Sequence, residues 1–151
     1  MEFSNKGKAI KGVEVRDNTM VIWGDESPRA FNFAVKPFVE ISEGANNTKL
    51  NFNENVLLAW FNQNNEINIA TETEIFTYLN DKQKKVILKE QIDKIEISKG
   101  NYIAVLSGDY IFTTYDGGEH WDKKMMKEPI LLHQISENGD LLVFTSKKNI
   151  D

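Results

Sequence analysis

The chain has 151 residues, of which 40% are hydrophobic and 27% are charged, a composition typical of one folded domain rather than a disordered chain. The formal net charge of −5 argues against nucleic-acid binding, which usually requires a basic surface. The chain contains no cysteine, which excludes disulfides, thiolate zinc sites and a cysteine nucleophile.

Short apolar runs separated by turn residues predict strands along the whole chain. The first group covers 10–16, 19–24 and 30–36, with 38–42 as a further candidate. An Asn-rich loop from Glu43 to Asn55 is expected to follow it. The large side chains expected in the core are Trp23, Phe31, Phe33, Phe38 and Trp60.

Two further groups of four strands are predicted after this loop. The second group is expected at 56–61, 65–71, 74–79 and 84–89, and the third at 93–98, 101–107, 110–115 and 120–125. Between Asp81 and Ile95, apolar residues are also spaced for one face of a helix. We favour a strand there because the chain repeats itself, as described below.

A fourth group contains only two predicted strands, 130–136 and 140–146, joined by the hairpin signal Asn138-Gly139. The second of these would leave unpaired backbone groups at a sheet edge. Three explanations are open at this point: Glu2 to Ala9 cover the edge, a partner chain covers it, or the chain is a fragment.

An internal repeat with a spacing of 36 residues organises the chain. Ile111-Phe112-Thr113 aligns with Ile75-Phe76-Thr77, and the flanking apolar alternation also matches. A period of this length is typical of propellers and solenoids. The sequence therefore predicts a single all-β domain over 1–151, made of about four propeller-like antiparallel meander units, the last incomplete. A β-sandwich is the alternative architecture.

The segment from Thr114 to Trp121 carries the most specific motif. Asp116 is placed to accept backbone N–H bonds within the turn, Gly118 permits a tight turn, and Trp121 covers the corner. The segment resembles the Asp-box, or BNR repeat, usually written Ser/Thr-x-Asp-x-Gly-x-Thr-Trp, with His120 in place of the threonine. The resemblance implies a structural β-hairpin that occurs in many unrelated proteins.

Asp-box proteins include sialidases, which grip the substrate carboxylate with an arginine cluster. This chain has only Arg16 and Arg29, so such a cluster is not possible. Glu72 and Glu74 alternate onto one face and are candidates for a catalytic carboxylate pair, although acidic residues near a turn usually face solvent.

The two histidines, His120 and His133, are too few and too far apart in the sequence for a metal site, and His120 is expected to pack at the turn. No phosphate-binding glycine loop and no nucleophile turn is present in the sequence. We therefore predict no catalytic activity, no cofactor and no metal.

A binding surface is predicted from the loops that join the second and third strands of each unit. These loops lie on one face of a propeller and carry acidic residues, with Tyr110 as an exposed aromatic anchor. Such a rim would attract a basic partner, although turns favour acidic residues regardless of function. The carboxylates expected to gather there are Asp25, Glu26, Glu72, Glu74 and Asp109.

These observations predict a non-catalytic protein-binding module, an acidic inhibitor or immunity protein that neutralises a basic toxin such as a nuclease. The alternative is a glycan-binding or glycan-processing fragment of a larger Asp-box protein, and a scaffold factor is a third possibility. Neither a hydrophobic signal core nor an apolar run of roughly 20 residues is present, so the chain as written is expected in the cytoplasm. Removal of a leader peptide would change this expectation to the periplasm or the exterior.

Overall fold

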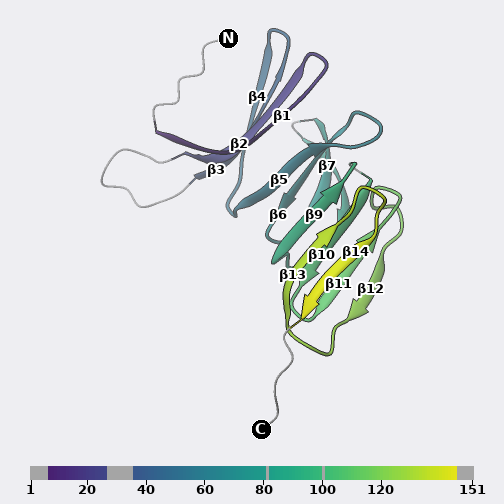
Figure 1. Cartoon of the computed structure of the whole chain (residues 1–151). Coiled ribbons are helices and arrows are strands. Elements are labelled where there is room, and N and C mark those ends of the chain that lie inside the picture. Colours follow the sequence, from purple (N-terminus) through teal and green to yellow (C-terminus); the bar gives the residue numbers. More distant parts are fainter. Residues whose placement is uncertain (1–6, 27–35, 81, 100, 146–151) are drawn as a thin grey trace.

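The computed structural model describes residues 7–26, 36–80, 82–99 and 101–145, and this part of the chain is all-β (Figure 1). It contains no helix that could cross a membrane. The first sheet contains β1 (Lys8–Arg16), β2 (Thr19–Glu26), β3 (Lys36–Glu43) and β4 (Asn46–Asn51). The second contains β5 (Val56–Phe61), β6 (Ile67–Thr71), β7 (Ile75–Asn80) and β8 (Gln83–Leu88). The third contains β9 (Lys94–Ser98), β10 (Tyr102–Ser107), β11 (Tyr110–Thr114) and β12 (Asp122–Met125), and the last contains β13 (Ile130–Ile135) and β14 (Leu141–Thr145).

Every sheet is an antiparallel meander in which each strand pairs with its neighbours in the sequence. The prediction of propeller-like repeated meander units is therefore confirmed. The ambiguous segment between Asp81 and Ile95 contains strand β8 and no helix in its described residues. The strand interpretation is correct there because β8 completes the second sheet by pairing with β7.

One element of the first sheet was assigned wrongly from sequence. The expected Asn-rich loop between Glu43 and Asn55 contains β4, which pairs with β3 along its whole length. Thr48 and Leu50 are half-buried while their neighbours are exposed, so the strand has a partly covered and a solvated face. Most of the predicted strand 30–36, with Phe31 and Phe33, lies outside the described residues.

The sheets are held together by apolar side chains between successive faces. One cluster joins the first and second sheets and includes Val21, Trp23 and Ile69, and another joins the second and third and includes Trp60 and Ile103. The predicted core residues Trp23, Phe38 and Trp60 are all buried. The first strand of each sheet contacts that of the next, β1 with β5, β5 with β9 and β9 with β13.

The first hairpin of each sheet has the same backbone feature. Its turn contains one residue with a positive φ, namely Asp17, Asn65, Lys99 and Gly139 in the four sheets. Asp, Asn and Gly adopt this left-handed conformation readily, whereas lysine does so less often. A positive φ is what tight hairpin turns commonly require, and all four first hairpins meet this requirement.

The free edge of β14 is not covered by the start of the chain, as far as the structure describes it. Lys8 and Ala9 belong to β1 and pair with Glu26 and Asp25 of β2. Of the three open explanations, cover by the start of the chain does not hold for these two residues, because β1 completes the first sheet instead. Residues 2–6 of the proposed cover lie outside the described residues.

Gly12 allows the indole of Trp23 to lie across β1. A Cβ atom at this position would be 2.1 Å from Cζ2 of Trp23, far inside van der Waals contact. We predict that Gly12→Ala lowers the free energy of unfolding by about 1–3 kcal/mol, because the indole must leave the core between the first two sheets. Urea denaturation measures this loss, and Asn47→Ala on exposed β4 should stay within about 0.5 kcal/mol. An unchanged midpoint for Gly12→Ala would contradict the tight packing described here.

Candidate functional site

The two acidic residues predicted in the first loop lie in a strand. Asp25 and Glu26 are the last residues of β2, and both are in ion pairs. Asp25 contacts Lys11 at 2.9 Å and Glu26 contacts Lys49 at 2.8 Å. The hydrogen bond from Lys49 also lowers the pKa of Glu26. Their placement in a free loop was wrong because β1 and β3 extend the ladder to these positions.

The other predicted binding residues have different surroundings. Glu74 forms an ion pair with Lys84, whereas Glu72 accepts a hydrogen bond of 2.9 Å from Asn55. The two carboxylates therefore face different partners, an arrangement unlike a catalytic carboxylate pair. Tyr110 is 36% exposed, and the ammonium group of Lys123 lies 4.2 Å from its ring centroid. Of the five predicted rim carboxylates, three are neutralised by lysines of the same chain.

Several carboxylates have no ion pair in the part of the chain that the structure describes, and four of them lie near one another where the second and third sheets meet. We call Glu54, Glu72, Asp93 and Asp109 the acidic edge. Glu54 accepts hydrogen bonds from the Thr73 hydroxyl, at 2.8 and 2.9 Å, and Asp93 accepts one of 2.7 Å from the amide of Gly108. All four residues are exposed or half-buried, so their charges face solvent.

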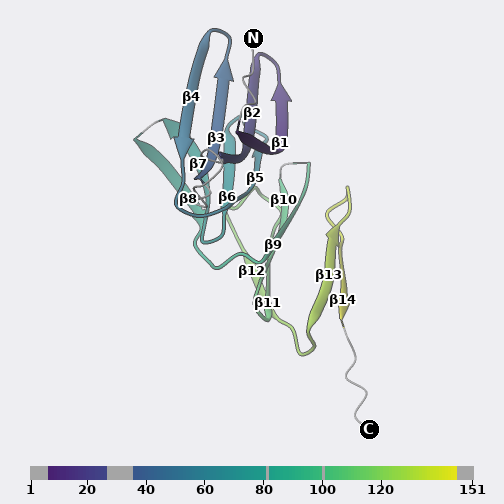
Figure 2. The same ribbon diagram turned by 90° about the vertical axis from the view of Figure 1, so that its left-hand side faces the viewer.

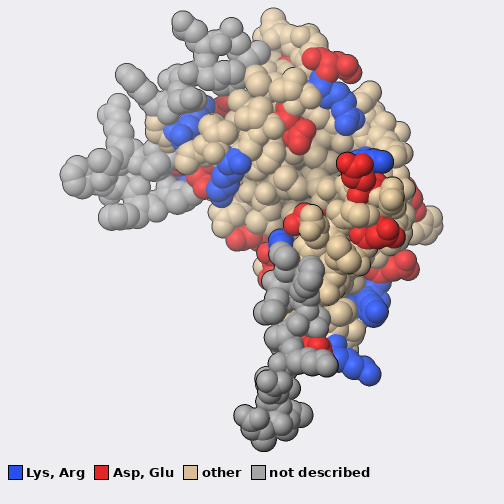
Figure 3. Space-filling view, in the orientation of Figure 1, with Lys and Arg blue, Asp and Glu red and all other residues tan. Residues whose placement is uncertain are grey.

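Backbone contacts place the members of the acidic edge next to one another across two sheets. The amide of Ile92 donates to the carbonyl of Glu72 at 2.7 Å, and the amide of Asp93 donates to the carbonyl of Leu106 at 2.8 Å. Sequence reasoning missed Glu54 and Asp93 because they lie in connections between sheets rather than in turns within them. Figure 3 shows Lys and Arg beside Asp and Glu over much of one face of the molecule.

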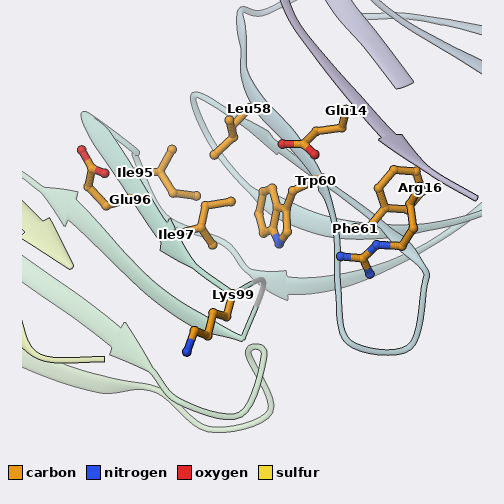
Figure 4. A pocket seen from close by; sticks show the side chains of 9 residues that line it. All are labelled: Glu14, Arg16, Leu58, Trp60, Phe61, Ile95, Glu96, Ile97 and Lys99. Carbon is orange, nitrogen blue, oxygen red and sulfur yellow. The ribbon is translucent and has the colours of Figure 1, made fainter. Parts of the chain in front are cut away.

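A groove of about 670 Å³ lies between the first strands of the first three sheets. Its apolar lining includes Leu58, Trp60 and Ile95, and the carboxylates of Glu14 and Glu96 lie on either side of these residues (Figure 4). The indole N–H of Trp60 is buried and has no hydrogen-bond partner among the described residues.

A second groove, of about 950 Å³, lies between β4 and the β7–β8 hairpin. Aromatic side chains contribute to its lining, with the ring centroids of Phe52 and Phe76 6.3 Å apart. The amide side chains that line it are Asn51, Asn53, Asn80 and Gln83. Aromatic surface together with hydrogen-bonding amides is suited to a polar organic ligand.

The turn between β11 and β12 is closed by hydrogen bonds from its own side chains. The hydroxyl of Thr114 accepts from the amide of Gly118 at 3.0 Å and donates to Asp116 at 2.8 Å. Asp116 accepts from the amide of His120 at 3.0 Å, as expected from the sequence. Side chains at both ends therefore hold the loop in one conformation.

His120 does not pack at the turn as expected. Its side chain is 92% exposed, and Nδ1 lies 2.7 Å from the Asp116 carboxylate. This hydrogen bond raises the pKa of His120, and the amide and imidazole of His120 lower the pKa of Asp116. Histidine replaces the threonine of the resembling motif without loss of the turn, because its side chain projects into solvent and bonds back to Asp116.

The Trp121 side chain connects the third sheet to the second. Its indole N–H donates to the carbonyl of Ile87 at 2.9 Å and also approaches the carbonyl of Gly118 at 3.1 Å. Ile87 lies at a register shift in the β7–β8 ladder, which leaves it without a partner residue on β7. The irregularity thus supplies an acceptor for a residue 34 positions later in the chain.

We predict that Trp121→Ala lowers the free energy of unfolding by about 3–5 kcal/mol, because it removes both the apolar contact and the bond to Ile87. Trp121→Phe keeps most of the ring and should cost about 1–2 kcal/mol, since the two carbonyls lose their donor. Chemical denaturation monitored by circular dichroism distinguishes the two losses. Equal stability of both variants and the unmodified protein would rule out this connection between the sheets.

His133 is fully buried where β13 meets the third sheet. Burial lowers the pKa of His133 and the positive charge of Lys94 adds to this effect, whereas Glu96 and an interaction with the backbone of Ala104 oppose it. Because the folded protein disfavours the charged imidazole, the unfolded chain binds a proton more readily below the ordinary histidine pKa of 6.5. The contribution of neutral His133 to stability is complete above that pH and is lost as the pH falls.

We therefore predict that the melting temperature falls between pH 7.5 and 5.5 (a window of about one pH unit on either side of the ordinary histidine pKa). His133→Leu should flatten this dependence because it removes the buried titrating group. The exposed His120–Asp116 pair acts with the opposite sign, losing its contribution as the pH rises, and is weakened by solvent. His120→Asn is therefore the control, and an identical slope in His133→Leu and the unmodified protein would contradict the assignment.

Comparisons with known proteins identify the fold and little else. No known protein family and no curated protein matches the chain. Among solved structures, the crystal structure of HIRA(644-1017) superimposes with a TM-score of 0.51 and 8% sequence identity, over 93% of this chain and 50% of that one. That structure has a propeller-type fold, and the present chain spans about half its length. In the described residues no group of three or more His, Asp or Glu is placed to hold a metal ion.

Proposed function

We propose that this chain is a non-catalytic protein-binding module that docks on a basic protein through the acidic edge. The observation that carries the proposal is the set of four solvent-facing carboxylates, Glu54, Glu72, Asp93 and Asp109, that have neutral or no partners in the described chain. Carboxylates already paired with lysines offer little to a partner, whereas these four present uncompensated charge.

The most concrete form of this proposal is an inhibitor or immunity protein that neutralises a basic toxin such as a nuclease. The acidic edge would approach the cationic groups with which such a toxin holds phosphates. The net charge of −5 supports encounter with a basic partner at low ionic strength. In this proposal the Thr114–Trp121 turn is a structural element of the Asp-box type and does not touch the partner.

Purification of the tagged full chain from its native cells, followed by mass spectrometry, tests whether a basic protein is bound. Glu72→Lys and Asp109→Lys should each weaken that complex about 10-fold or more at low salt, and less at high salt. Glu137→Lys changes the same charge in the exposed β13–β14 turn, at the other ends of the strands, and should have little effect. Binding that survives reversal of both edge residues would refute the proposal.

A glycan-binding role is a second candidate, favoured by the groove between β4 and the β7–β8 hairpin. Aromatic rings and amide side chains line it together, as suits the apolar faces and hydroxyl groups of a sugar. Reproducible hits on a glycan array that disappear in Asn53→Ala and Gln83→Ala would support this role. An array without hits would leave protein binding as the function to pursue.

A further inference from the structure

The face of the first sheet that points away from the second is not covered by any other sheet in the described chain. Gly12 and Glu14 pair with Trp23 and Val21, whose side chains belong to the core facing the second sheet. Strand alternation places the residues between them on the opposite face. We call that opposite face the leading face.

The leading face exposes apolar side chains along β1. Ile10 is 41% exposed, Val13 50% and Val15 64%. They pair with Gly24, Ile22 and Met20 of β2. On the same face Ile22 is 6% exposed and Phe38 of β3 is fully buried, so the exposed apolar surface is confined to β1. In the described residues, the boundaries between the first and second and between the second and third sheets bury such residues against the next sheet. A row of exposed β-branched residues on a sheet face indicates an interaction surface.

The last described sheet, the β13–β14 hairpin, also has a face that points away from its neighbouring sheet. On the β13–β14 hairpin His133 and Ile135 are buried toward the third sheet, whereas Gln134 between them is exposed and pairs with Leu142. Leu142 is 56% exposed. We call this outer side of the hairpin the trailing face. Figures 1 and 2 both show the hairpin apart from the first sheet, and no extended contact joins β13 or β14 to that sheet in the described residues.

We propose that two copies of this chain associate head to tail, with the leading face of each packed on the trailing face of the other, so that the sheets form one closed ring. The contact continues the face-to-face stacking that already joins the sheets within one copy. The chain also spans about half of a propeller-type structure, so a second copy would supply the other half of such a ring. Contacts between unlike surfaces close into a ring when the rotation fits, as a half-ring from each copy requires.

The association state of the full chain is the first test. Light scattering coupled to size-exclusion chromatography should give twice the chain mass of 17.3 kDa. A monomer at all concentrations would overturn the proposal and indicate that a different protein or segment covers the leading face. A concentration-dependent series of larger species would also overturn it, because the ring would then be open.

Variants at the two ends test which surfaces meet. Val13→Glu and Leu142→Glu should each raise the dissociation constant at least about 100-fold, because each buries a carboxylate without a partner. Val86→Glu is the matched control, since Val86 is 43% exposed on outer strand β8 and lies on neither end face. Circular dichroism confirms that each variant is folded. A variant Leu142→Glu that remains dimeric would exclude the trailing face.

Cross-linking separates the head-to-tail arrangement from one in which two leading faces meet. Because the chain contains no cysteine, Val13→Cys and Leu142→Cys each introduce a single thiol. A thiol-specific cross-linker should join the two variants only when they are mixed. Efficient cross-linking of Val13→Cys to itself would show that like faces meet, and would overturn the proposal. This test does not depend on the proposed basic partner.

Discussion

The hydrophobic clusters of this protein form where one sheet packs on the next, and this constraint governs the rest of the structure. A four-stranded meander has two faces and too few residues to form a core of its own. The clusters around Trp23 and Trp60 are therefore built from successive sheets. The same constraint leaves the leading and trailing faces as the places where the pattern of burial ends.

Connections outside the ladders then fix the sheets relative to one another. The Trp121 indole bonds to the irregular residue Ile87 of the preceding sheet, while the hydroxyl of Thr114 and the carboxylate of Asp116 close the turn that holds the indole. The hydrogen bonds within this turn and the bond from its tryptophan to the preceding sheet therefore stabilise the same part of the structure. His120 forms an exposed hydrogen bond to Asp116. The turn is therefore kept although histidine stands where the Asp-box motif has threonine.

The number of acidic residues does not show where negative charge is left unpaired on the surface. Ion pairs such as Asp25 with Lys11 and Glu74 with Lys84 join neighbouring strands and neutralise most of the carboxylates predicted to bind a partner. The members of the acidic edge lie in turns and connections, and among the described residues none of them is in an ion pair. Binding proposals for this fold therefore depend on which carboxylates are unpaired, and net charge alone does not reveal that.

The class of fold can be predicted from the amino-acid sequence alone, because strand alternation, turn residues and a 36-residue repeat are local or periodic signals, and the antiparallel ladders agree with them. It missed β4, whose Asn-rich strand is defined by pairing with β3 rather than by its own composition. It misjudged the predicted rim because a residue such as Glu26 finds Lys49 only when distant strands align. Which carboxylates stay unpaired and which sheet faces stay exposed could not be predicted from the sequence, since both depend on contacts between residues far apart in the chain.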